Sequence, residues 1–169
     1  IHINDCESNC SKRVSISGGT INVSRGLTIT SRSGIINITG ETDIQVTDHA
    51  APGRTRRRMT MVADGLLLED NTVHLEADLI DLYAYSQLIM AATPVGESDL
   101  VLRSAGFLRM SPGHGLGWSV SSLVAMASTM SLEPDHRIEV KKQSDNCEPH
   151  RRADASNSFC KRLVDFLPD

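Results

Sequence analysis

The chain of 169 residues is poor in aromatic residues, with three Phe, two Tyr and one Trp. A hydrophobic core must therefore be built mainly from aliphatic side chains and Met, within a hydrophobic share of 40%. Basic residues are not in excess either, because 17 Lys and Arg stand against 21 Asp and Glu, for a net charge of −4. Nucleic-acid binding requires a strongly basic face, so the composition argues against a nucleic-acid partner.

Long apolar runs and familiar catalytic motifs are also missing. The longest apolar stretch, Leu79 to Ala92, is interrupted by polar residues, so we expect no transmembrane segment in this chain. There is no Gly-x-Ser-x-Gly elbow, no His-Glu-x-x-His helix and no dinucleotide fingerprint. The Gly-rich stretch 111–117 lacks the Lys-Ser/Thr ending of a phosphate loop, and His114 within it is interpreted as a turn residue. We expect no catalytic, cofactor-binding or metal-binding residues and no cofactor.

The sequence does contain a repeated dyad of two apolar residues separated by one other residue. This pattern is typical of a short strand with one buried face. Turn-forming pairs such as Gly18-Gly19 and Asp64-Gly65 separate successive dyads, which recur about every eight residues. The sixteen dyads are Val14–Ile16, Ile21–Val23, Leu27–Ile29, Ile36–Ile38, Ile44–Val46, Met59–Met61, Leu66–Leu68, Val73–Leu75, Ile80–Leu82, Leu88–Met90, Leu100–Leu102, Leu108–Met110, Trp118–Val120, Val124–Met126, Met130–Leu132 and Ile138–Val140.

Strands this short favour an all-β fold of the β-helix or β-solenoid type, with about sixteen short strands. The alternative is a β-sandwich, whose longer strands usually carry two or three inward side chains each. A narrow stack of coils also explains why large aromatic rings are scarce. Either one chain forms about five three-strand coils, or three chains wind together; the nearly uniform unit favours the intertwined homotrimer.

The dyads divide the chain into three parts. Residues 1–13 are expected to form an N-terminal cysteine cap, residues 14–140 the β-helical repeat domain, and residues 141–169 a C-terminal tail. Within the tail the apolar residues change to a helical period, which predicts a short capping helix over the last strand edge. The helix face consists of Phe159, Leu163, Phe166 and Leu167.

Three segments inside the repeat domain interrupt the rhythm, one of which is the Gly-rich stretch 111–117. Residues 47–58 contain Pro and Gly followed by a run of arginines, and we interpret them as an exposed basic loop. Arg54, Arg56 and Arg57 have the Arg-x-Arg-Arg spacing that furin-like proteases cut, so they form a possible processing site; a patch for an anionic ligand and a simple solvated loop are the alternatives. Residues 93–99, with Pro94 and Gly96, are interpreted as a second loop.

The four cysteines flank the repeat; they are Cys6, Cys10, Cys147 and Cys160. The two ends of a rod lie far apart, so disulfide geometry allows only local pairing, Cys6–Cys10 and Cys147–Cys160. Such bridges are typical of an oxidising compartment. Interchain bridges in a trimer, reduced cysteines, and a zinc site of Cys147, His150 and Cys160 completed by Cys6, Cys10 or His2 remain alternatives.

Three Asn-x-Ser/Thr sequons, at Asn9, Asn22 and Asn37, are possible glycosylation sites. Asn22 and Asn37 are the middle residues of dyads, so their side chains should point outward. Together with the cysteines and the Arg-x-Arg-Arg run, the sequons favour an extracellular, secreted or virion-surface protein.

A catalytic β-helix would need carboxylates, or a carboxylate with Arg or Lys, on one exposed wall. Asp78 and Asp81, near Tyr83, are the best candidates. Asp81 is the middle residue of a dyad and Asp78 precedes it, which are positions where solvated charges are ordinary. We therefore expect no enzyme activity, with a monomeric carbohydrate-active enzyme as the alternative.

The rhythm of dyads and turns over residues 14–140 resembles two families of three-chain β-helix. One is the central spike of contractile phage tails and type VI secretion needles, through units such as Gly19-Thr-Ile-Asn-Val23. The other is the sarcoglycan extracellular domain, through stretches such as Asp99-Leu-Val-Leu102 and Met130-Ser-Leu132-Glu. Both resemblances imply a mechanical or assembly role without catalysis.

We therefore expect a non-enzymatic structural protein that forms a rigid extracellular or virion-surface stalk or spike. Its partners would be two further copies of the chain or related β-helix subunits, and any other protein or glycan partner is not specified by the sequence. A subunit of a sarcoglycan-like membrane glycoprotein complex is a further alternative.

Overall fold

The structure, a computed structural model, describes residues 2–3, 13–47, 56–112, 117–132 and 138–140. Strands make up 77% of these residues and none of them is helical, so the all-β prediction is confirmed. The strands are β1 (His2–Ile3), β2 (Arg13–Val23), β3 (Gly26–Val46), β4 (Arg58–Leu68), β5 (His74–Glu76), β6 (Leu79–Met90), β7 (Thr93–Val95), β8 (Asp99–Ser104), β9 (Phe107–Met110), β10 (Trp118–Val120), β11 (Ser122–Met126), β12 (Thr129–Leu132) and β13 (Ile138–Val140).

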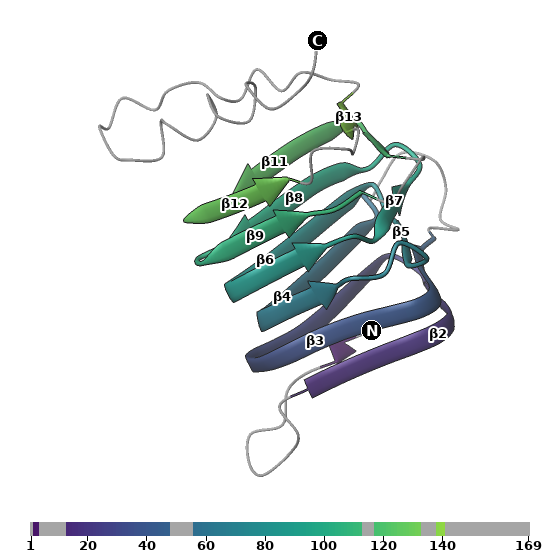
Figure 1. Cartoon of the computed structure of the whole chain (residues 1–169). Coiled ribbons are helices and arrows are strands. Elements are labelled where there is room, and N and C mark those ends of the chain that lie inside the picture. The colour runs from purple at the N-terminus through teal and green to yellow at the C-terminus, as the bar shows by residue number, and fades with distance from the viewer. Residues whose placement is uncertain (1, 4–12, 48–55, 113–116, 133–137, 141–169) are drawn as a thin grey trace.

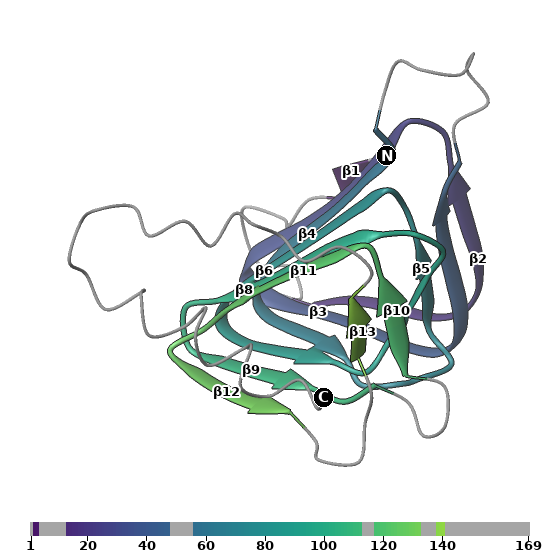
Figure 2. The same ribbon diagram turned by 90° about the horizontal axis from the view of Figure 1, so that it is seen from above.

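These strands form a three-sided β-solenoid of about five turns (Figures 1 and 2). The first side stacks β1, the first parts of β3, β4 and β6, then β8 and β11. The second side stacks the first part of β2, the middle of β3, the last parts of β4 and β6, then β9 and β12. The third side contains the last parts of β2 and β3, then β5 and β7, with β10 paired to β13.

Every strand pair among the described residues is parallel, and each coil is closed by a single chain. Ile80 of β6, for example, pairs with Met59 one coil before it and with Leu100 one coil after it. Between each of these pairs of residues the chain runs along the other two sides of the solenoid. Parallel stacking of this kind excludes the β-sandwich, whose strands would pair as antiparallel hairpins.

The structure thus has the single-chain form of the β-helix, and the intertwined homotrimer favoured by the sequence is not shown. In that arrangement each layer would take one strand from each of three chains, whereas here all three strands of a layer come from one chain. Uniform dyad spacing does not separate the two forms, because the three sides of a single-chain coil are similar in length.

The dyads form the core, as the sequence predicts. The inward residues of the central coils, such as Ile36, Leu66 and Leu88, are completely buried and lie in one aliphatic column. Trp118 is the largest side chain in that column and is 1% exposed. A coil this narrow buries few residues by itself, so its stability depends on stacking against its neighbours.

One dyad was predicted in the wrong phase. Val124 and Met126 of β11 are 38% and 47% exposed, while Leu123 and Ala125 point into the core. The whole segment is apolar, so the sequence does not distinguish its two faces. Pairing with the inward residues of β8 decides the phase, because a shift of one residue exchanges the faces of a strand.

The predicted loop 93–99 also requires correction, because its first three residues form β7. Pro94 is buried and pairs with Leu75 of β5, on the third side of the coil. Proline lacks a backbone N–H and interrupts the apolar dyad, and for this reason the sequence predicted a turn.

Other predictions fall on residues that the structure does not describe. They concern the cysteine cap and the capping helix, and the residues Cys6, Cys10, Cys147, Cys160, Asn9, Arg54 and His114. In the described part of the chain, no helix is long and apolar enough to cross a membrane.

Candidate functional site on the outer wall

The arginine segment, Arg56 to Arg58, lies at the end of the predicted basic loop and at the start of β4. Arg57 donates hydrogen bonds from Nε and Nη2 to Oδ1 of Asp78, at 2.9 and 2.6 Å. The backbone N–H of Arg57 donates to Oδ2 of the same carboxylate at 2.9 Å, and its Nη1 lies 3.6 Å from Glu76. Arg57 is thus tied to the chain that enters the next coil.

The other two arginines of the segment also pair with acidic residues of later coils. Arg56 forms an ion pair with Asp99. Arg58 donates from Nη2 to Oδ2 of Asp81 at 2.8 Å, and Arg103 donates from Nη2 to Oδ1 at 2.7 Å. Arg58 belongs to β4, so the predicted basic loop is corrected at that residue alone. The side chains of Arg56 and Arg58 are about half exposed even though they pair with carboxylates of the solenoid wall.

Asp81 lies on the outer wall of the first side, yet only 6% of its surface is exposed. The sequence correctly placed it at an outward position but predicted a solvated charge. The two arginines cover it from the neighbouring coils. Arg58 pairs with Leu79 and Arg103 with Tyr83, each two residues from Asp81, so both side chains reach the carboxylate diagonally. Both carboxylate oxygens of Asp81 are consequently engaged in charge-assisted hydrogen bonds.

Backbone hydrogen bonds also fix Arg57, the last residue of the possible processing site. The N–H of Arg57 is bonded to Asp78, and its carbonyl oxygen accepts a hydrogen bond from the N–H of Leu79 at 3.0 Å. A protease would have to break these bonds to bind the Arg57–Arg58 peptide in its active site. Cleavage after Arg57 stays a prediction.

The hydrogen bonds from Arg57 hold the pKa of Asp78 below its ordinary value, against the opposite effect of partial burial. A lowered pKa in the folded state means that the carboxylate stabilises the fold above its ordinary pKa. This contribution is lost as the pH falls through the lowered pKa.

We expect Asp78→Asn to reduce the free energy of unfolding at pH 7 by about 0.2–1 kcal/mol, the range for half-exposed ion pairs. Urea unfolding of both proteins at pH 7 and at steps into acid should show the difference shrinking as Asp78 of the parent becomes protonated. Asp64→Asn is the matched control, because its side chain makes no ion pair with another described residue. A difference that stays constant down to strong acid would contradict the role assigned to the charge.

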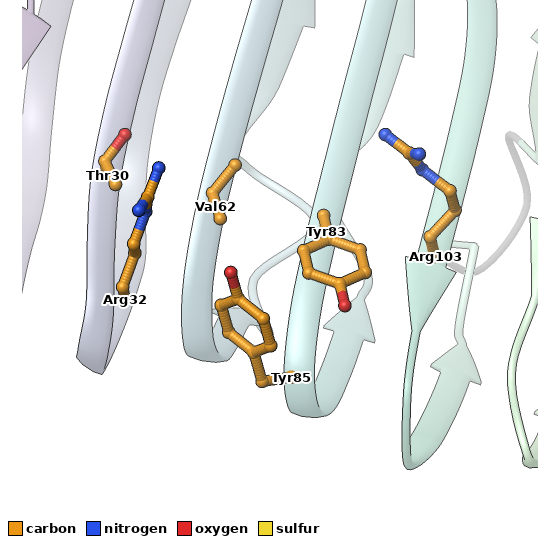
Figure 3. A pocket seen from close by; sticks show the side chains of 6 residues that line it. All are labelled: Thr30, Arg32, Val62, Tyr83, Tyr85 and Arg103. Atoms are coloured by element: carbon orange, nitrogen blue, oxygen red, sulfur yellow. The ribbon is translucent and has the colours of Figure 1, made fainter.

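Next to this network the outer wall has a hollow of about 300 Å³. We call it the tyrosine hollow; it is lined by Thr30 and Arg32 of β3, Val62 of β4, Tyr83 and Tyr85 of β6, and Arg103 of β8 (Figure 3). Alternation along β6 places both tyrosines on the outer face, two residues apart.

The two tyrosines and Arg103 form one contact group in the hollow. The rings of Tyr83 and Tyr85 meet edge to face, with centroids 4.9 Å apart and planes at 82°. The guanidinium carbon of Arg103 lies 5.6 Å from the centroid of Tyr83, within the range of a cation–π contact. Asp81, on the same wall, shares its carboxylate between Arg103 and Arg58.

The sequence singled out Tyr83 but missed Tyr85, Arg103 and Arg32. A usable signal was present, because both tyrosines of the chain occupy outward positions of one strand although aromatics are rare. Arg103 could be placed beside them only once the coil length was known, since it pairs with Tyr83 from the next coil.

The two described sequons differ in exposure. Asn22 is exposed on β2, as predicted, and its Oδ1 accepts a hydrogen bond from the Thr47 hydroxyl at 2.6 Å. Asn37 is only half-buried on the second side, and its Oδ1 is buried without a hydrogen-bond partner in the described part of the chain. Glycosylation of either residue stays a prediction.

No family model, curated protein or solved structure matches this chain. The resemblance to β-helix proteins is therefore supported by the solenoid itself, at the level of the fold. Within the described ranges no group of three or more His, Cys, Asp or Glu could hold a metal ion. The alternative zinc ligands Cys147, His150 and Cys160 lie outside those ranges.

Proposed function

We propose that this chain is a non-enzymatic structural module that forms a rigid stalk or spike on an extracellular or virion surface. The observation that carries the proposal is the continuous aliphatic column through all coils, with ion pairs that join neighbouring coils along the outer wall. At about 4.8 Å per coil, five coils make a rod about 25 Å long. Hydrogen bonds between all coils resist bending and extension of such a rod.

The use made of the candidate carboxylates also supports a structural role. Asp78 receives three hydrogen bonds from Arg57, and Asp81 is held between Arg58 and Arg103. A general acid or base needs a carboxyl group that can exchange a proton with substrate. Charge-assisted bonds to both oxygens of Asp81 oppose that use.

We further propose that intact solenoids associate, as a homotrimer or with related β-helix subunits of the spike or sarcoglycan kind. Because one chain closes each coil, such a trimer would join folded monomers instead of winding three chains together. The alternative enzyme is favoured by one observation, the juxtaposition of Asp81, Arg103 and Tyr83 on one wall.

Multi-angle light scattering over a range of protein concentrations tests the association. We expect three times the chain mass at high concentration, and on dilution a monomer that keeps its β-sheet circular dichroism, since no strand is shared between chains. The assembly role would be contradicted if the chain stayed a compact monomer at every concentration and also failed to bind any protein that co-purifies with it from the native source.

A second measurement separates the structural module from the enzyme. The protein is incubated with a panel of neutral and acidic polysaccharides, and new reducing ends and unsaturated products are measured. We expect none above the background of heat-denatured protein. Product formation that is abolished in Asp81→Asn would instead establish the carbohydrate-active enzyme.

A further inference from the structure

We propose that the tyrosine hollow binds one sugar ring that carries an anionic group, either a carboxylate or a sulfate. This inference goes beyond the structural role and does not depend on self-association. It rests on the aromatic rings that line the hollow, on the charges beside it and on its volume.

The aromatic rings supply the surface that a sugar ring needs. Tyr85 is 43% exposed although it is a large hydrophobic residue, and Tyr83 beside it is half-buried. A tyrosine presents an apolar face to the C–H groups of a sugar and a hydroxyl group to its oxygens. The hydroxyl of Thr30, on the same wall, adds another donor and acceptor.

The charges at the hollow favour an anionic ligand. Two guanidinium groups, those of Arg32 and Arg103, line it, and no carboxylate of the described residues does so. Arg32 is exposed and makes no ion pair with any other described residue. Arg103 uses Nη2 for Asp81, and its Nε is buried without a hydrogen-bond partner within the described ranges, so Arg32 is the more accessible of the two guanidinium groups. Arginine is suited to bidentate binding of a carboxylate or a sulfate.

The size of the hollow limits the ligand to a small unit. A volume of about 300 Å³ is at the lower end for ligand pockets, which suits one ring with its acidic group better than an extended chain segment. The net charge of −4 also disfavours a long polyanion lying along the whole wall. The inferred ligand is therefore a terminal or isolated acidic sugar.

The test is a titration of the ¹⁵N-labelled full chain followed by NMR. Three probes are added separately: galacturonic acid for the carboxylate, glucose 6-sulfate for the sulfate, and glucose as the neutral form. We expect millimolar binding of one or both acidic sugars, with shifts centred on the hollow, and at least tenfold weaker binding of glucose. Which acidic probe binds more tightly identifies the anionic group.

Three variants assign the binding to the hollow. Arg32→Ala should weaken binding of the acidic sugar about tenfold or more, and Tyr85→Ala about threefold to tenfold. Both side chains are exposed, so the variants should fold, and this is checked by circular dichroism. Arg13→Ala is the matched control, because Arg13 is an exposed arginine on β2 outside the hollow.

Three results would overturn the inference. The first is no shift at the hollow with either acidic probe at tens of millimolar. The second is equal binding of glucose, which would remove the role of the charge. The third is an equal loss in Arg13→Ala and Arg32→Ala, which would show a general effect of net charge instead of a site.

Discussion

Gly106→Ala is expected to destabilise the solenoid by about 3 kcal/mol, at the upper end for overpacked sites. Gly106 lies at the corner between β8 and β9, and a Cβ there would overlap the carbonyl oxygen of Ser86 in the coil before it. That oxygen belongs to the backbone and cannot rotate away. Hydrogen bonds from Ala105 N–H to Ala84 and from Thr129 N–H to Gly106 hold this corner between its neighbours.

Gly65→Ala is the control, because Gly65 lies beside the same corner two coils earlier: it pairs with Gln87, which pairs with Phe107, the residue after Gly106. A Cβ there would meet Ile35 Cγ1 at 3.4 Å and Gln87 Cγ at 3.9 Å, which are ordinary contacts with side chains. We expect a change within about 1 kcal/mol, with a gain possible because alanine restricts the unfolded chain. Urea unfolding measures the free energy of unfolding of both variants. Equal changes in the two variants would contradict the specific effect of the Ser86 carbonyl oxygen.

Leu66→Ala is expected to lower the free energy of unfolding by about 2–5 kcal/mol. Leu66 is completely buried in the central column, between Ile36 of the coil before it and Leu88 of the coil after it. Truncation removes apolar contacts on both sides and leaves a cavity, which stacked coils cannot close without losing their register. Thermal and urea unfolding of the variant measure the loss.

Leu67→Ala provides the control in the same strand, because Leu67 points outward and is only half-buried. Its truncation should cost about 1 kcal/mol or less, in proportion to the smaller apolar area that it buries. Similar losses for the two leucines would mean that the Leu66–Leu68 dyad does not point inward. The phase of the strand, and with it the solenoid register, would then be wrong.

The inward half of the structure could be predicted from the sequence because burial requires apolar residues at every second position. Fifteen of the sixteen dyads were assigned to a strand face without contradiction from the described side chains. The phase failed at Leu123 to Met126, where both faces of the strand are apolar, and β7 was missed where Pro94 replaces a dyad residue. In both segments the neighbouring coil decides the register, so local sequence carries too little information.

The outward half was harder to predict, and the candidate site belongs to it. The alternation in β6 was enough to place Asp81 and Tyr83 on the outer wall, but their neighbours in space are Arg58 and Arg103. Arg58 and Arg103 lie 23 and 22 positions from Asp81 in the sequence. Their approach depends on the coil length, which the dyad spacing did not specify because it allowed one chain or three per layer.

The sequence by itself therefore determined the inward residues of all but one dyad and the stacked all-β fold, since the hydrophobic effect acts on every dyad separately. It did not predict that β2, β3, β4 and β6 continue round corners as strands of 11 to 21 residues. Only the tertiary structure decided which dyads lie on one another in a single chain: most are three places apart, but Ile80–Leu82 stacks on Leu100–Leu102, two places on, because β7 carries no dyad. Strands stack at about 4.8 Å, and at that separation charged and aromatic groups one coil apart become direct neighbours. The ion pairs of Asp81 and the tyrosine hollow are consequences of that stacking.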